Sequence, residues 1–142
     1  MVIETRNVKE TLELGIKIGQ EAKPGLVIAL EGDLGVGKTV LAQGVAKGLG
    51  VEEMVCSPTF TIVQVYEEGR YPFYHFDVYR LEDPDEMYEV GFEDYFYGEG
   101  VCMVEWAEMI KEILPSSYLK IEISKDPQQG VDYRKITLTQ VG

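Results

Sequence analysis

The chain has 142 residues, enough for one domain with a full hydrophobic core, and its formal charge of −12 makes it strongly acidic. Proteins that bind nucleic acid on their own present basic patches to phosphates, and this sequence has only four arginines, so its composition argues against direct RNA or DNA binding. Two cysteines without a disulfide framework, no signal peptide and no long apolar run predict a reduced, cytoplasmic protein that does not engage a membrane.

The first third of the chain alternates strand and helix patterns. Asn7 and Glu10 are typical of the capping pair that begins a helix, and the wholly apolar run 26–30 is typical of a buried parallel strand. The predicted elements in order are a strand at 2–5, an amphipathic helix from Val8 to about 23–25, a strand at 26–30 and a helix at 40–49 that stops at Gly50.

The rest of the chain continues this alternation with shorter elements. Pro84 suits the first position of a helix, and Pro115 ends another. The predicted elements are a hairpin of strands at 61–66 and 71–79, short helices at 85–89 and 92–97, a buried strand at 101–104, a helix at 108–114, and strands at 119–124 and 133–139. We therefore expect a single α/β domain over 1–142, with a mixed central sheet, parallel core strands, antiparallel edges and helices on both faces.

Residues 32–39 carry the most specific motif, G-x-x-x-x-G-K-[ST], between the predicted strand and helix. Backbone N–H groups of such a loop cradle phosphates, Lys38 places a charge at the β- and γ-phosphates, and the Thr39 hydroxyl can coordinate Mg²⁺. The motif predicts a P-loop site for a nucleoside triphosphate, formed by Gly32, Asp33, Leu34, Gly35, Val36, Gly37, Lys38 and Thr39, with Val40 directly after them.

Two carboxylates at predicted strand ends are candidates to complete this site. Glu105 follows the apolar strand at 101–104, where it could hold Mg²⁺ directly, hold it through a water molecule, or orient the attacking water. Asp77 closes the neighbouring candidate strand, and His75 alternates with it on the same face, so we interpret His75 as shaping the surroundings of Asp77. For Trp106, packing in the core is the first reading, and a lid or partner contact the second.

Further residues are candidates for a switch or for a docking surface. Ser57 and Thr59 place hydroxyls in a loop after the P-loop helix, where nucleotide switches sense the γ-phosphate. Residues 81–110 contain no basic residue and ten acidic ones, which fits either a solvated face or a docking surface for a basic protein partner.

Four motifs together resemble the TsaE (YjeE) family of small bacterial ATPases. They are Gly-Asp-Leu-Gly-Val-Gly-Lys-Thr at 32–39, Ser-Pro-Thr-Phe at 57–60, His-Phe-Asp-Val-Tyr-Arg at 75–80 and Val-Glu-Trp at 104–106. The motifs occur in order over nearly the whole chain, and the set is far more specific than the P-loop alone.

The resemblance implies an ATPase that takes part in forming threonylcarbamoyladenosine beside the anticodon of tRNA. In that family the ATPase docks on a complex of TsaB and TsaD, its hydrolysis of ATP is thought to reset the complex between turnovers, and tRNA is reached only through the complex. By similarity, Lys38 and Thr39 bind phosphate and Mg²⁺, Glu105 is the second carboxylate on the metal side, and Asp77 is needed for activity. Family nucleotide contacts would also fall near Val8, Glu108 and Arg134, and Val40 replaces a threonine of the family.

The mechanism and three alternatives remain open at this stage. ATP would lie on the loop at 32–39 with its adenine between the N-terminal helix and the C-terminal strands, and either Arg80 or a partner's basic residue would act as the arginine finger. A small P-loop kinase usually has more lid arginines than this chain, and a GTP-dependent switch needs an N-K-x-D sequence that is absent here. A nucleotide-binding adaptor without catalysis is the third alternative.

Overall fold

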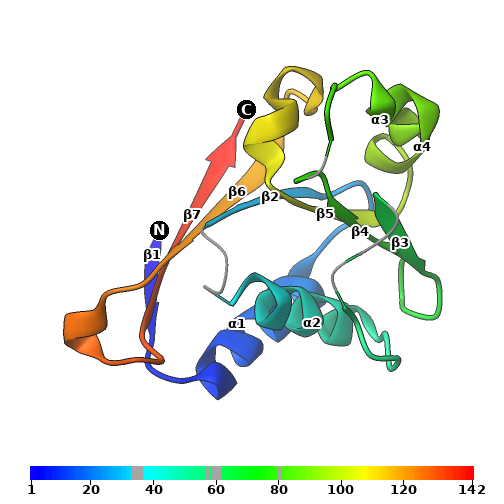
Figure 1. Ribbon diagram of the computed structural model, residues 1–142. Coiled ribbons are helices and arrows are strands. Elements are labelled where there is room, and N and C mark those ends of the chain that lie inside the picture. The colour runs from blue at the N-terminus through cyan, green and yellow to red at the C-terminus, as the bar shows by residue number, and fades with distance from the viewer. Residues whose placement is uncertain (33–36, 57, 59–61, 80) are drawn as a thin grey trace.

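The structure is a computed structural model that describes residues 1–32, 37–56, 58, 62–79 and 81–142. Within these residues seven strands form one sheet in the order β1-β7-β6-β2-β5-β4-β3 (Figure 1). The strands are β1 (Val2–Thr5), β2 (Val27–Glu31), β3 (Val63–Tyr66), β4 (Phe73–Asp77), β5 (Val101–Glu105), β6 (Tyr118–Ser124) and β7 (Arg134–Val141).

The four central strands, β4, β5, β2 and β6, run parallel to one another. β3 joins β4, β7 joins β6 and β1 joins β7, each antiparallel, so the predicted mixed sheet is confirmed. β5 is buried at every position and β2 at all but its last, because helices cover both faces of these strands.

Apart from the short 3₁₀ helix η2 (Pro127–Gln129) between β6 and β7, the helices form two layers, one on each side of the sheet (Figure 1). One layer is α1 (Val8–Glu21) with α2 (Lys38–Leu49), and the other is α3 (Glu86–Glu89), α4 (Phe92–Phe96) and the 3₁₀ helix η1 (Ala107–Ile113). The predicted cap of α1 is confirmed: Glu10 N donates to Asn7 Oδ1 at 2.8 Å, and Arg6 N donates to Glu10 Oε1 at 2.6 Å.

Glycines allow α1 and α2 to touch along their backbones. A Cβ atom on Gly19 would lie 2.2 Å from the carbonyl oxygen of Val45, and one on Gly48 would lie 2.2 Å from that of Ile16. Any side chain at either position would push the helices apart. The contact therefore fixes α1 against the helix whose first residue is Lys38.

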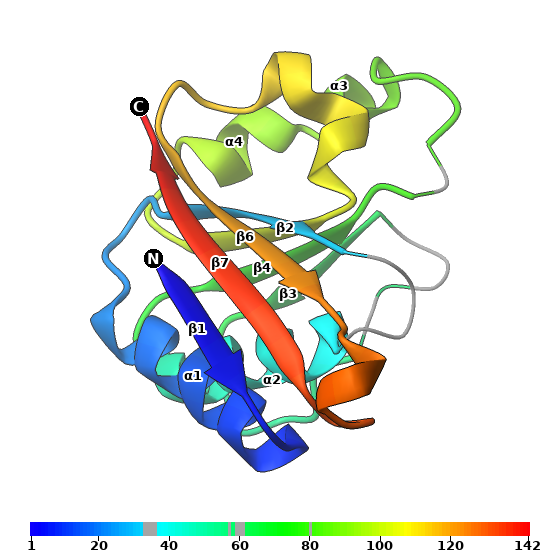
Figure 2. The ribbon, with the colours of Figure 1, turned by 90° about the vertical axis from the view of Figure 1, so that its left-hand side faces the viewer.

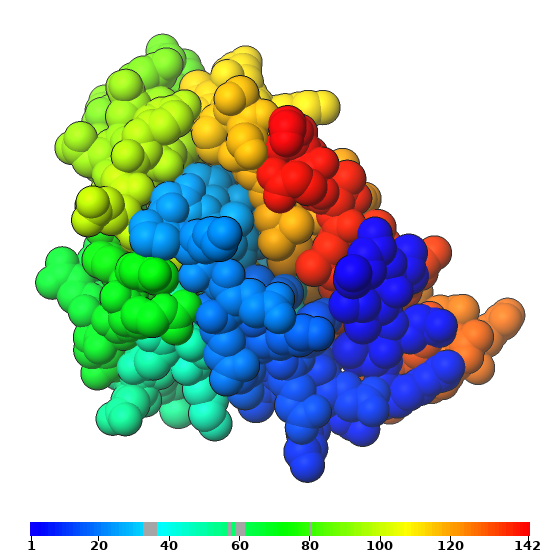
Figure 3. Space-filling model, turned by 180° about the vertical axis from the view of Figure 1, so that it is seen from behind, coloured from blue at the N-terminus to red at the C-terminus, as the bar shows by residue number. Residues whose placement is uncertain are grey.

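The sheet has one open region, over β6, β7 and β1. In Figure 2 these strands cross the front of the molecule, and none of the described helices covers the face that is turned to the viewer, whereas Ile121 and Ile136 on the other face pack in the core with α1 and α2. β1 and β7 pair antiparallel, which brings residues from the two ends of the chain side by side, as the view from behind also shows (Figure 3).

Two details differ from the predictions. The helix expected at 108–114 is a 3₁₀ helix at Ala107–Ile113, because Ile110 has non-helical angles (φ −127°, ψ 30°) that interrupt it. Pro84 does not begin α3 either. Pro84 and Asp85 form a turn in which Glu86 N donates to the carbonyl oxygen of Asp83 at 3.0 Å, and the helix begins at Glu86. No helix among the described residues is long and apolar enough to cross a membrane.

Candidate active site

The candidate site lies where the carboxyl ends of β2, β5 and β4 meet the amino end of α2. The register pairs Leu30 with Glu105 across β2 and β5, and Glu105 with Asp77 across β5 and β4. The structure therefore brings together the two carboxylates that the sequence places at strand ends. This edge of a parallel sheet is where α/β proteins bind their ligands.

Lys38 is buried although it carries a charge. Its residue is 6% exposed, its Nζ donates to the carbonyl oxygen of Gly32 at 2.8 Å, and the same atom lies 3.8 Å from the centroid of the Trp106 ring. The residue before it, Gly37, has φ 101°, a left-handed angle that glycine adopts without strain. The turn at Gly37 thus directs the Lys38 side chain back across the start of the glycine loop.

Glu105 is held by a histidine. It is 3% exposed, and its Oε2 lies 2.6 Å from Nε2 of His75, which has no exposed surface. The alternation of β4 pointed to Asp77 as the neighbour of His75, whereas the direct hydrogen bond is made to Glu105 on the adjacent strand. Only the parallel pairing of β4 with β5 brings these side chains together, and nothing local in the sequence signals that pairing.

Asp77 completes the acidic pair. Burial raises the pKa of its carboxyl above the usual range, and the negative charge of Glu105 raises it further. The hydrogen bond that its Oδ1 accepts from Tyr79 N at 3.0 Å lowers the pKa, as does the positive charge of Lys38. The positive charge of the loop lysine Lys38 thus acts on the strand-end carboxyl group of Asp77.

Trp106 has the only positive φ among the described residues other than glycine, with φ 62° and ψ 36°. Such an angle is uncommon for a bulky side chain. Its ring is half-buried beside Lys38, and its centroid lies 4.7 Å from that of Tyr79. Trp106 packs against the layer of α3, α4 and η1, as the first sequence reading expects, and its ring lies over Lys38, while a lid or partner contact stays a prediction.

A family model and individual relatives identify the same protein family for this chain. A model of the family described as "Threonylcarbamoyl adenosine biosynthesis protein TsaE" matches residues 5–136. The chain belongs to the TsaE family. The Bacillus subtilis (strain 168) protein named "tRNA threonylcarbamoyladenosine biosynthesis protein TsaE" is 49% identical over 138 residues, covering 97% of this chain and 84% of the relative. A protein of the same name from Nostoc sp. (strain PCC 7120) is 46% identical over 117 residues, covering 80% and 71%.

A solved structure matches this TsaE-family chain along its whole length. "Crystal structure of Bacillus subtilus YdiB" has a TM-score of 0.82 at 43% sequence identity and covers 100% of this chain and 86% of that chain. The likeness agrees with the mixed sheet described above, so the predicted α/β P-loop fold is confirmed.

The other residues predicted for the site of this TsaE-family chain have different outcomes. Arg134 lies beside the loop, since its Nε would be 3.9 Å from a Cβ on Gly37, and its Nη1 donates to the carbonyl oxygen of Tyr133 at 2.7 Å. Thr39 and Val40 follow Lys38 in α2 and are half-buried. A nucleotide contact stays a prediction for the exposed Val8 and Glu108. The predicted positions Asp33, Leu34, Gly35, Val36, Ser57, Thr59 and Arg80 lie outside the described residues.

The described residues include no group of three or more His, Cys, Asp or Glu side chains that could hold a metal ion. Mg²⁺ is usually held by one or two carboxylates, water molecules and substrate phosphates. Coordination of Mg²⁺ by Thr39 and Glu105 stays a prediction.

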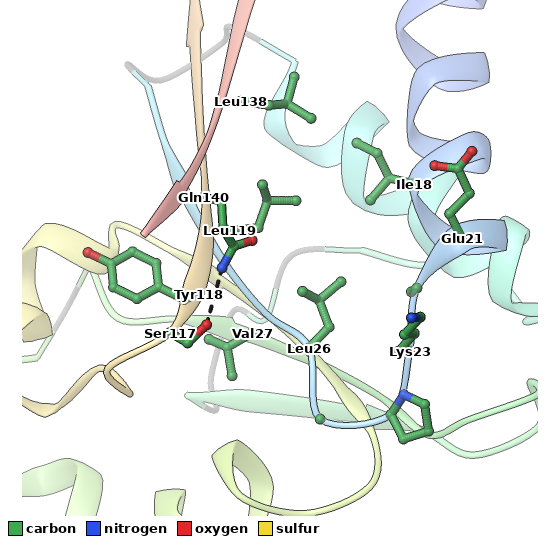
Figure 4. A pocket seen from close by; sticks show the side chains of 13 residues that line it. Ile18, Glu21, Lys23, Leu26, Val27, Ser117, Tyr118, Leu119, Leu138 and Gln140 are labelled. Atoms are coloured by element: carbon green, nitrogen blue, oxygen red, sulfur yellow. Dashed lines mark hydrogen bonds between the residues drawn. The ribbon is translucent and has the colours of Figure 1, made fainter. Parts of the chain in front are cut away.

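A separate cavity of about 440 Å³ lies at the opposite, amino end of β2, between the end of α1 and the strands β6 and β7 (Figure 4). Aliphatic side chains such as Leu26, Leu119 and Leu138 line much of it, and Ser117 Oγ accepts a hydrogen bond from Gln140 Nε2 at 3.2 Å. It lacks the glycine loop and the carboxylate pair, so its lining does not suit a triphosphate.

Proposed function

We propose that this TsaE-family chain is a Mg²⁺-dependent ATPase that acts in the formation of threonylcarbamoyladenosine in tRNA. It does so with a protein complex of the TsaB–TsaD type, and ATP hydrolysis resets that complex between turnovers. The observation that carries the proposal is the position of buried Lys38, at the amino end of α2, beside the strand-end carboxylates Glu105 and Asp77. The names of the relatives support the pathway.

The residues present fit ATP and Mg²⁺. Lys38 Nζ lies at the carbonyl oxygen of Gly32 and at the face of the Trp106 ring, and its ammonium group can form a charge-assisted hydrogen bond with a phosphate oxygen. Thr39 would offer its hydroxyl to Mg²⁺ as the residue after the loop lysine. When bound, Mg²⁺ supplies positive charge that offsets the charge of the phosphates.

The carboxylates supply the second half of the chemistry. Glu105 accepts hydrogen bonds with its carboxylate, so it would orient a water molecule toward the γ-phosphate or toward the metal. Asp77 lies next to it in register, and its raised pKa reflects a partly desolvated position close to another negative charge. A pair of this kind repels additional negative charge, so Lys38 and Mg²⁺ are both needed before a triphosphate can settle there.

The layer of α3, α4 and η1 is our candidate docking surface for the partner. All of its residues except 111–113, which include Lys111, lie in the stretch 81–110 that has no basic residue, and Tyr88 and Met109 are 55% and 45% exposed there. Trp106 connects this layer to Lys38, so a partner that binds the layer would act on the loop through a short path. A basic residue of the partner would supply the positive charge that speeds hydrolysis.

The decisive experiment measures phosphate release from ATP by the chain alone and with a purified TsaB–TsaD complex, together with a pull-down. We expect slow hydrolysis alone and at least tenfold faster hydrolysis with the complex, because a finger in trans stabilises the transition-state charge. Equal rates with and without the complex, combined with no co-purification, would overturn the proposal. Nucleosides added as acceptors test for a kinase, and they should not become phosphorylated.

A further inference from the structure

The hydrogen bond between His75 and Glu105 has no role in the function proposed so far. We propose that His75 is a positioning residue that fixes the orientation of Glu105 by donating Nε2–H to its Oε2. This inference rests on the proposed ATP hydrolysis, because the value of a fixed Glu105 lies in orienting water or metal there. His75 itself, which lies beneath the surface, contacts neither the substrate nor the metal.

The geometry supports a strong, ordered contact. The two atoms are 2.6 Å apart, shorter than most N–H···O bonds, as expected when the acceptor is a charged carboxylate. His75 has 0% and Glu105 3% exposed surface, so water does not compete for the bond. Both side chains come from neighbouring parallel strands whose backbones are already fixed, β4 and β5.

The second ring nitrogen identifies which partner donates. His75 Nδ1 is buried and has no hydrogen-bond partner among the residues that the structure describes. A buried N–H without an acceptor is rare and costly, whereas a bare ring nitrogen needs no acceptor. The arrangement therefore favours a neutral ring with its hydrogen on Nε2, facing an ionised Glu105.

The surroundings of His75 hold the ring in place. Its ring stacks on that of Phe73, two residues earlier on the same face of β4, with centroids 6.0 Å apart and an angle of 30° between the planes. A glutamate has three side-chain torsions, and without an anchor it samples many positions. The hydrogen bond from the stacked, buried histidine removes this torsional freedom from the Glu105 side chain. It does so without changing the backbone of Glu105 or the residues around it.

The first test compares two variants with a matched control. In His75→Phe the ring keeps its approximate shape but loses the donor, and we expect kcat for ATP hydrolysis to fall by roughly 10–100-fold, as for the loss of a residue that orients a ligand. KM for ATP should change less than about threefold, because Lys38 and the loop do the binding. His75→Gln returns an amide N–H near the Nε2 position and should recover most of kcat.

Tyr74→Phe is the control. It lies on the same strand but faces the opposite layer, where its ring packs against Tyr95 with centroids 4.7 Å apart. It should leave kcat and KM unchanged. If His75→Phe and His75→Gln lose the same fraction of kcat, or if KM rises while kcat stays constant, the positioning role is refuted.

A double-mutant cycle links the effect to Glu105. Once Glu105→Gln has removed the carboxylate, adding His75→Phe should lower the residual rate by less than about twofold, because residues that act as a unit are not additive. Additive losses would instead mean that His75 acts elsewhere.

The second test does not depend on activity, and its first measurement uses the unmutated protein. The chain has one histidine, so ¹⁵N-labelled protein gives the signals of a single imidazole. At neutral pH we expect a protonated Nε2 and a bare Nδ1, and Glu105→Gln should shift the Nε2 resonance. A ring protonated on Nδ1, or one insensitive to Glu105→Gln, overturns the inference. If the spectrum agrees but no hydrolysis occurs under any condition, the proposed function fails while the hydrogen bond stands.

Discussion

The two helical layers of this molecule are built in opposite ways. α1 and α2 are long, and they meet through glycines at distances that exclude a single methyl group. α3, α4 and η1 are short, and α3 and α4 meet through aromatic rings packed edge to face, such as Tyr88 and Phe92 with centroids 5.1 Å apart. The first layer fixes backbone positions, and the second presents side chains at the surface. One face of the sheet thus carries a rigid layer, and the other face carries a layer that exposes its side chains to solvent.

The candidate site lies where the two layers meet at the carboxyl ends of the strands. Lys38 belongs to the first layer, and Trp106 packs with the second. Their contact, 3.8 Å from the ammonium to the ring centroid, joins the layers directly. We call the place where Lys38 meets Trp106 the junction. If this division of roles is correct, substitutions at the junction should change catalysis, and substitutions between α1 and α2 should change stability. Substitutions on the candidate docking surface of α3, α4 and η1 should change partner binding.

The largest effect is expected at the junction. Glu105→Gln keeps the size of the side chain but removes the charge that orients water or metal, and we expect kcat for ATP hydrolysis to fall by roughly 10²–10⁴-fold, the range for a positioned acid or base. Binding of ATP, measured by calorimetry, should change little. Glu112→Gln, an exposed position in η1, is the control and should keep the full rate. Cellular function that stays intact in Glu105→Gln although hydrolysis is lost would favour the non-catalytic adaptor, and retained hydrolysis would show that Glu105 does not orient the water or the metal.

The next effect tests the rigid layer. Gly48→Ala places a methyl group where the Ile16 carbonyl oxygen already lies, and we expect the free energy of unfolding to fall by about 3 kcal/mol or more. Urea denaturation measures this change. Lys17→Ala, on the exposed face of α1, should shift the same free energy by less than about 0.5 kcal/mol. If Gly48→Ala is equally harmless, the helices adapt to the methyl group and this layer is not rigid.

The sequence predicts the fold well because the strongest patterns are local. The apolar run at 26–30 and the Asn7 cap each act within a few residues, and the structure has a strand and a helix start there as expected. The bond between His75 and Glu105 could not be predicted, because it joins positions 30 residues apart through strand order. Likewise, the left-handed Trp106 and the 3₁₀ form of η1 depend on packing, which residue propensities do not capture.

The candidate docking surface formed by α3, α4 and η1 should govern partner binding. Charge reversal at Asp85 and Glu89 should weaken binding of a TsaB–TsaD complex by about tenfold, mainly through a slower on-rate, and the loss should shrink at high salt. Glu86, which a sequence-based design would include, is better left intact, because its Oε2 accepts hydrogen bonds from the backbone of Glu82 and Asp83 at 2.9 and 3.3 Å.

Glu13→Lys with Glu21→Lys is the matched control for this surface. Both glutamates are exposed on α1 in the other layer, and the pair produces the same change in net charge. Equal weakening by both pairs would show that total charge, and not the surface formed by α3, α4 and η1, determines the affinity.

The smallest effect concerns the stability of the junction itself. Burial raises the pKa of Asp77, so folding makes its ionised form less favourable, and the stability of the protein falls as pH rises through that pKa. Asp77→Asn has no charge to lose. At neutral pH it should therefore raise the free energy of unfolding, by less than about 1 kcal/mol because solvent screens a half-buried group. Its Oδ1 can still accept the bond from Tyr79 N.

The pH dependence separates this cause from a change in packing. Below the usual pKa range of an aspartate, the wild-type carboxyl is also neutral, so the advantage of Asp77→Asn should disappear in acid. Thermal denaturation of both proteins across this range measures the difference. An advantage that persists in acid would show that desolvation of the charge is not the cause. An advantage confined to neutral pH, together with lost hydrolysis, would mean that the protein keeps a destabilising carboxylate because the chemistry at the junction requires it.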